Sequence, residues 1–313
     1  MINKIIQGDA LTVLKTMPAE SVDCIVTSPP YYGLRDYGVQ GQIGLEKTLN
    51  EYLERMLAIT AELKRVLKKT GTMWWNHGDS YGTISGGTQQ LANGELSTQY
   101  GDIKYDAKKF AVSQNRDKGV PEKCLTMQAH RLTIRMIDEQ KWVLRNTIIW
   151  HKTNCMPSSA KDRFTVDYEL IFFFTKAKKY WFEQQFEPLA NPERKNFTSG
   201  SRVFGENPDR NDNDLGERSK DFLFPLGRSK RSVWKIPTKP YSEAHFATFP
   251  PALIETPIKA GCPKEGIVLD PFMGSGTTAL VARSLGRKYI GVELNGEYIK
   301  LAEKRLSQRV LPC

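Results

Sequence analysis

The sequence lacks the features that mark several common classes of protein. Its five cysteines are scattered and form no Cys-x-x-Cys pair, which argues against a disulfide framework and against a zinc site. No stretch approaches the roughly 18 consecutive apolar residues of a membrane helix. The opening residues, Met1-Ile-Asn-Lys-Ile-Ile6, lack the long apolar region of a signal peptide. We therefore expect a soluble cytoplasmic protein that needs no metal and has no membrane partner.

Two nucleotide-binding motifs are also missing. The chain has no Gly-Lys-Ser/Thr string, so it does not carry the phosphate loop of an ATPase. The third glycine of the dinucleotide fingerprint is absent, because Ala279 and Leu280 occupy that region. This absence opposes a nucleotide-dependent oxidoreductase, an alternative that binding of a nicotinamide cofactor would revive.

What the sequence does have is size and positive charge. Its 313 residues, 40% of them hydrophobic, suffice for one large domain or for a core domain with an insertion. The formal net charge of +10 fits a polyanionic partner such as nucleic acid, although charge alone does not establish one.

One stretch near the end of the chain predicts a ligand site. Residues 267–269 are apolar and predict a buried parallel strand that ends at Asp270, and residues 277–285 predict a helix. Between them, Gly274 and Gly276 form a turn where a ligand can approach the backbone close to the helix N-terminus.

The next apolar run, residues 289–294, carries an acidic residue at its end. Glu293 lies at the distance along the chain where a carboxylate can accept hydrogen bonds from the two hydroxyls of a ribose. The pattern thus indicates a ligand with a ribose.

A second informative string lies near the start of the chain. Residues 4–7 predict a strand, residues 10–17 a short helix and residues 22–26 a strongly apolar strand. That strand runs into Thr27-Ser-Pro-Pro-Tyr-Tyr32, where two prolines hold the backbone in a rigid extended turn.

The two strings together resemble one enzyme family. Asp270-Pro-Phe-Met-Gly-Ser-Gly276 resembles the S-adenosylmethionine loop of the amino-methylating DNA methyltransferases. Ser28-Pro-Pro-Tyr31 resembles the Ser/Asp-Pro-Pro-Tyr catalytic string of the N4-cytosine and N6-adenine enzymes. The catalytic string precedes the cofactor loop, which is the order of that family's beta group. The resemblance implies methyl transfer from S-adenosylmethionine to an exocyclic amine of double-stranded DNA, in a prokaryotic or phage-encoded enzyme.

The resemblance also implies roles for particular residues. The Ser28 side chain and the Pro29 carbonyl would accept hydrogen bonds from the target amine, Pro30 would stiffen the turn, and Tyr31 would stack on the flipped-out base. The expected cofactor-binding residues, at the strand ends and in the glycine turn, are Asp9, Asp270, Phe272, Gly274, Ser275, Gly276, Thr277 and Glu293. Of these, Asp9 would accept from the adenine amine, Phe272 would pack near the adenine, and Asp270 would face the methionine amino group.

Alternating helical and apolar strand patterns predict the fold class. A capping box at Thr48 and Glu51 starts a helix expected to end before Gly71, and strands are expected at 72–75, 142–150 and 169–174. The fold should be α/β, a doubly wound, mostly parallel, Rossmann-like sheet with an inserted target-recognition region. We expect residues 1–182 and 240–313 to form this core, and a further helix at 125–139.

Two stretches break the pattern. Residues 80–120 are rich in glycine and polar residues, and form either a loop that closes over DNA or a loop with no role. Residues 183–239 combine basic clusters such as Arg228-Ser-Lys-Arg231 with Phe197, Phe204, Phe222, Phe224 and Trp234. This composition, and the place in the chain, favour a target-recognition region over a solvated surface insertion.

Several alternatives stay open at this level. Ser rather than Asp before Pro-Pro leans toward cytosine N4, with adenine N6 as the alternative. Methylation of cytosine carbon-5 is disfavoured, because the only Pro-Cys pair is Pro312-Cys313. A DNA-binding protein that no longer reacts is the alternative from a different class. The sequence does not reveal the recognised bases, and it leaves open whether the chain forms a homodimer.

Overall fold

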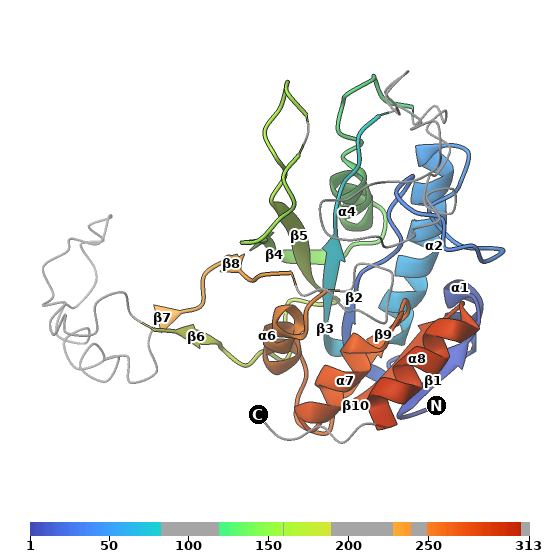
Figure 1. Ribbon diagram of the computed structural model, residues 1–313. Coiled ribbons are helices and arrows are strands. Elements are labelled where there is room, and N and C mark those ends of the chain that lie inside the picture. Colours follow the sequence, from blue (N-terminus) through green and yellow to red (C-terminus); the bar gives the residue numbers. More distant parts are fainter. Residues whose placement is uncertain (83–118, 159, 189–227, 239–248, 308–313) are drawn as a thin grey trace, which may run out of the picture. The chain divides into compact units, whose positions relative to one another are not determined.

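The computed structural model describes residues 1–82, 119–158, 160–188, 228–238 and 249–307 (Figure 1). Its strands are β1 (Lys4–Gln7), β2 (Val22–Thr27), β3 (Leu67–His77), β4 (Val143–His151), β5 (Tyr168–Thr175), β6 (Phe186–Glu187), β7 (Arg228–Ser229), β8 (Val233–Lys235), β9 (Ile267–Asp270) and β10 (Lys288–Glu293). Its helices are α1 (Ala10–Thr16), α2 (Leu49–Val66), α4 (Gln128–Asp138), α6 (Pro251–Gly261), α7 (Thr277–Ser284) and α8 (Gly296–Ser307).

Eight of the described strands form one sheet in the order β1-β10-β9-β2-β3-β5-β4-β8. Neighbouring strands pair in parallel except for β5, which is antiparallel to both β3 and β4. The carboxyl ends of the other seven strands therefore meet at one edge, and the amino end of β5 lies at that edge with them. This mixed, mostly parallel sheet confirms the predicted α/β class.

Helices cover both faces of the sheet, α1, α2 and α4 on one side and α6, α7 and α8 on the other (Figure 1). Alternate residues of each strand pack into the two core layers, one on each side of the sheet, as the pleat requires. On β2, for example, Ile25 packs in the first layer, whereas Cys24 and Val26 pack in the second. The strands are apolar on both sides because each side is covered by helices.

Helix α2 begins at the predicted capping box and ends before Gly71, as expected. Thr48 and Glu51 form both hydrogen bonds of the capping box. The helix ends at Val66, and β3 starts at once at Leu67, which pairs with Val22 of β2. The strand predicted at 72–75 therefore starts earlier, at Leu67, because this residue already pairs with β2.

The chain divides into two compact units, Met1–Glu183 with Ser232–Cys313, and Gln184–Arg231. The second unit ends before residue 239, the predicted limit of the recognition region, because β8 pairs with β4 of the main sheet. Trp234 of β8 is buried in the core of the first unit, so its expected place among recognition aromatics is wrong.

Several predicted features lie outside the described residues. They are most of the 80–120 stretch and the four phenylalanines between 197 and 224.

Candidate active site

The two strings that resemble methyltransferase motifs meet at the carboxyl edge of the sheet. Strands β2 and β9 are neighbours, so the residues that follow them are brought together. A hydrogen bond of 2.6 Å from the Thr27 hydroxyl to Asp270 joins the end of β2 to the end of β9. The Ser28–Tyr31 string and the glycine turn thus follow two strand ends that are joined by a hydrogen bond.

Asp270 is buried inside this junction. One carboxylate oxygen accepts from Thr27 and from the Phe272 N–H, and the other accepts from the Thr278 hydroxyl at 2.6 Å. Burial raises the pKa of Asp270 to about 6, although these hydrogen bonds act in the opposite direction. Its carboxylate therefore holds the loop between β9 and α7, a task that the sequence pattern did not indicate.

The glycine turn has the backbone conformation that the motif suggested. Gly274 and Gly276 have φ values of +52° and +82°, which side-chain-bearing residues rarely adopt. A Cβ on Gly276 would also lie 2.7 Å from the Cβ of Ala302 on α8, whereas a Cβ on Gly274 would meet nothing within 4 Å. The turn therefore has no room for a side chain where Gly276 faces α8, but it has free space at Gly274.

Glu293 lies beside this turn, at the end of β10. Its carboxylate accepts from the Gly274 N–H and the Asn295 N–H, both at 2.8 Å. The Gly274 N–H is therefore already bonded within the protein. Burial raises the pKa of Glu293 above its usual value.

Ser275 and Thr277 point toward α8. Arg305 donates to the Ser275 carbonyl at 2.7 Å, to the Ser275 hydroxyl at 2.8 Å and to the Thr277 hydroxyl at 3.1 Å. Both residues are almost fully buried. They shape the turn through Arg305, which the sequence analysis missed because nothing in the local pattern pairs residues about 30 apart.

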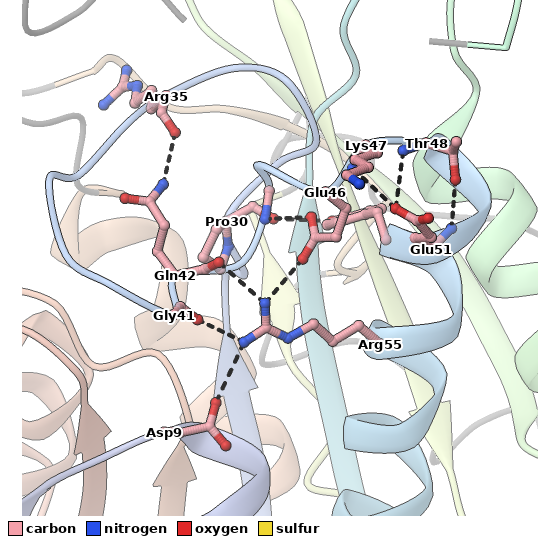
Figure 2. A network of polar contacts seen from close by, with 12 residues as sticks. Asp9, Pro30, Arg35, Gly41, Gln42, Glu46, Lys47, Thr48, Glu51 and Arg55 are labelled. Atoms are coloured by element: carbon pink, nitrogen blue, oxygen red, sulfur yellow. Dashed lines mark hydrogen bonds and ion pairs between the residues drawn. The ribbon is translucent and has the colours of Figure 1, made fainter. Parts of the chain in front are cut away.

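Asp9 follows β1, the strand next to β10. Its side chain caps α1 by accepting from the N–H and the hydroxyl of Thr12, both at 2.9 Å. Its second oxygen lies 3.7 Å from the Arg55 guanidinium, which also donates to the carbonyls of Gly41 and Gln42 (Figure 2). Arg55 thereby ties the segment after the catalytic string to the strand end that carries Asp9.

The catalytic string is held by a chain of hydroxyl contacts. The Ser28 hydroxyl lies 3.1 Å from the Tyr31 hydroxyl, which donates to Glu169 at 2.9 Å. Glu169, at the amino end of β5, also accepts from Asn76 at 3.2 Å and from the Lys152 ammonium at 2.5 Å. Antiparallel β5 is what allows a strand start to contribute to this edge.

The Tyr31 ring rests on a buried histidine. Its ring lies 5.0 Å from that of His77, nearly parallel to it. Trp75 donates to His77 Nδ1, and burial lowers the pKa of His77 to about 4. His77 is therefore neutral, with its proton on Nε2, directed toward Tyr52 at 3.2 Å. One face of the Tyr31 ring is therefore covered by His77.

The two prolines of the string differ in their contacts. Tyr52 donates to the Pro30 carbonyl at 2.9 Å. Among the described residues, no hydrogen bond reaches the Pro29 carbonyl. The Pro29 carbonyl is thus available to accept a hydrogen bond, whereas the Pro30 carbonyl already accepts one from Tyr52.

Glu169 and Lys152 were also missed at the level of sequence. A signal was present for Glu169, because it is a lone charge at the start of the apolar run Leu170-Ile-Phe-Phe-Phe174. For Lys152 there was none, because its partner lies on the neighbouring strand.

Comparisons with known proteins agree with this arrangement. Residues 22–304 match the N6/N4 methyltransferase family, whose description is DNA methylase. The chain is 41% identical over 302 residues to the type II methyltransferase M.XycI of Xanthomonas campestris pv. cyanopsidis, covering 96% of this chain and 86% of the relative. It is 39% identical to the type II methyltransferase M.Cfr9I of Citrobacter freundii, with the same coverage.

Solved structures share the fold. The cytosine-N4-specific PvuII DNA methyltransferase superposes with a TM-score of 0.65 at 19% identity, covering 99% of this chain and 88% of that one. TTHA0409 of Thermus thermophilus, solved with S-adenosyl-L-methionine, gives a TM-score of 0.55 at 21% identity, covering 97% and 93%. The chain belongs to the N6/N4 family of type II DNA methyltransferases.

Two kinds of feature are absent from the residues that the structure describes. No group of histidine, cysteine and carboxylate side chains there could hold a metal ion. None of the helices in that part of the chain is long and apolar enough to cross a membrane.

Proposed function

We propose that this protein transfers a methyl group from S-adenosylmethionine to the exocyclic amine of a flipped-out base in DNA, with cytosine N4 as the preferred target. The observation that carries the proposal is the hydrogen bond between Thr27 and Asp270. It joins the strand end before Ser28 to the glycine turn expected to hold the cofactor.

The residues at the edge fit S-adenosylmethionine. The turn is open at Gly274, and the Glu293 carboxylate beside it is held in place by two backbone N–H groups. Asp9 lies two residues beyond the end of β1, and Glu293 is the last residue of β10, which pairs with β1 through Gln7 and Glu293. Two carboxylates on adjacent strand ends suit the ribose hydroxyls and the adenine amine of one adenosine.

The roles of the loop residues follow from their contacts. Gly274 and Gly276 would admit the methionine part, and Phe272, whose N–H donates to the buried Asp270, would pack near the adenine. Ser275 and Thr277 act through Arg305, and Asp270 anchors the loop from inside. S-adenosylmethionine supplies an electrophilic methyl group when bound.

The chain's own residues make the amine reactive. The lone pair of an exocyclic amine is delocalised into the base, and acceptors on its hydrogens favour a directional lone pair. Ser28 and the Pro29 carbonyl are placed to act as these acceptors, and the rigid turn fixes their direction in advance. Tyr31, whose ring is backed by His77, would stack on a base that has left the duplex.

The choice of amine rests on Ser28. A serine before Pro-Pro favours cytosine N4 by resemblance, and the structural neighbour with the higher TM-score of the two is a cytosine-N4-specific enzyme. Adenine N6 methylation would use the same groups. A DNA-binding protein without activity is disfavoured because the catalytic string and the cofactor turn are intact. We place the enzyme on DNA in the bacterial cytoplasm.

The test is methyl transfer to mixed-sequence DNA, followed by mass analysis of the nucleosides. We expect N4-methylcytosine; N6-methyladenine would reverse the choice of amine, and no methylated base would favour the inactive DNA-binding protein. In single-turnover assays, Ser28→Ala should lower the rate by roughly one to three orders of magnitude while the affinities for cofactor and DNA stay nearly constant. A wild-type rate in that variant would refute the catalytic role of Ser28.

A further inference from the structure

The contacts behind the catalytic string determine which way its hydroxyls point. Tyr31 has a single hydroxyl proton, and that proton is donated to Glu169. Burial, and then the nearby Glu169 carboxylate, raise the pKa of Tyr31 well above its usual value, so the hydroxyl keeps this proton. In its contact with Ser28, Tyr31 can then only accept, and Ser28 must be the donor.

This direction has a consequence for Ser28. Because the Ser28 hydroxyl donates its proton to Tyr31, both lone pairs of the serine oxygen can accept hydrogen bonds from other groups. Among the described residues, Tyr31 is the only partner of the Ser28 hydroxyl. The serine is therefore presented as an acceptor, which is what a target N–H requires.

The contacts of Glu169 fix the direction of the hydrogen bonds that run from Ser28 through Tyr31 to Glu169. A carboxylate only accepts hydrogen bonds, and the Lys152 ammonium donates to the other Glu169 oxygen at 2.5 Å. Asn76 donates to the same oxygen that receives Tyr31, and to the Leu170 carbonyl at 3.1 Å, which fixes the carboxylate's rotation. The side chains of Glu169 and Lys152 are each only about one-fifth exposed, so water competes weakly for these bonds.

We infer that Glu169 is a positioning residue for methyl transfer: through Tyr31 it orients the Ser28 hydroxyl so that the serine oxygen accepts a hydrogen bond from the target amine. This inference rests on the proposed function of Ser28. Lys152 supports Glu169, and neither residue touches the base.

Glu169→Gln tests the direction of these hydrogen bonds, because it hardly changes the shape of the side chain. Lys152 would attract the amide oxygen, which turns the amide NH₂ toward Tyr31. Tyr31 would then donate to Ser28, and one acceptor lone pair of the serine would be occupied. We expect the single-turnover rate to fall about tenfold or more, which is one lost hydrogen bond in the transition state, with the affinities for S-adenosylmethionine and DNA unchanged.

Two further variants separate positioning from a general structural effect. Tyr31→Phe keeps the ring and removes the link, so it should slow the reaction as Glu169→Gln does, and adding Glu169→Gln to it should cost nothing more. Glu20→Gln is the matched control, because Glu20 pairs with Lys176 just beyond the opposite end of β5. It should react at the wild-type rate.

The outcomes separate this inference from the proposed function. A wild-type rate in Glu169→Gln, or a loss that persists in full on the Tyr31→Phe background, overturns the positioning role. A loss accompanied by weaker cofactor binding and a lower melting temperature overturns it too, in favour of a structural role. If Ser28→Ala itself reacts normally, the proposed function of Ser28 fails, whatever Glu169 does.

Discussion

At the scale of single residues, the buried carboxylate of Asp270 has a measurable cost. Burial raises its pKa from 3.8 to about 6, so between these pH values the native state binds more protons than the unfolded chain. Stability from this group is therefore fully present below pH 3.8 and is lost as the pH rises toward 6. A shift of about two units corresponds to about 3 kcal/mol.

Asp270→Asn should remove this pH dependence. We expect the stability of the wild type relative to the variant to fall by about 3 kcal/mol from pH 4 to pH 7, measured by urea unfolding without cofactor. Asp162→Asn is the control, because Asp162 is an exposed partner of Lys123. Parallel stability curves for wild type and Asp270→Asn would contradict the assignment.

Gly276 offers a second test at this scale. Gly276→Asp should abolish S-adenosylmethionine binding, because the left-handed backbone and the contact with Ala302 leave no room for a side chain. Gly286→Asp is matched to it: Gly286 has a φ of +69°, but a Cβ there meets nothing within 4 Å. Calorimetry should show binding in the Gly286 variant only. Normal affinity in Gly276→Asp would remove the proposed cofactor site.

At the scale of elements, α8 supports the cofactor turn from behind. Arg305→Gln removes three hydrogen bonds to Ser275 and Thr277, and should weaken S-adenosylmethionine binding by about 1–3 kcal/mol. Lys300→Gln, on the same helix, breaks only an exposed pair with Glu297 and should bind normally. Equal affinities in the two variants would show that the turn keeps its shape without α8.

Elements differ in how much the sequence reveals of them. The capping box of α2 and the glycine turn before α7 were predictable, because both depend on residues within a few positions of each other. The start of β3 at Leu67 was not, because pairing with β2 outweighs the helical pattern there. Glu169, Lys152 and Arg305 were missed for the same reason, since each acts on a residue from a distant part of the chain.

At the scale of the whole molecule, the net charge of +10 predicts DNA binding that weakens with salt, because basic side chains displace counterions from phosphates. In the unit Gln184–Arg231, Arg228 and Arg231 both pair with Glu187. Replacing Arg228, Lys230 and Arg231 by glutamine should weaken DNA binding and flatten the slope of log K against log salt by about 2–3.

Glu187→Gln is the control for this prediction. It removes an acidic partner of both arginines and leaves every positive charge in place, so the salt slope should be retained or become steeper. A triple variant with the wild-type salt dependence would place the DNA-binding surface elsewhere in the chain.

The hydrogen bond between Thr27 and Asp270 also sets the order in which the enzyme becomes active during synthesis. It spans 243 positions, and β2 needs β9 as a neighbour just as β1 needs β10. At about 5–20 residues per second, the catalytic string waits on the order of tens of seconds on the ribosome for its partner strand. During that time β2 presents an apolar, unpaired edge. The pairing that brings the two strings together is therefore made only after the C-terminal strands have been synthesised.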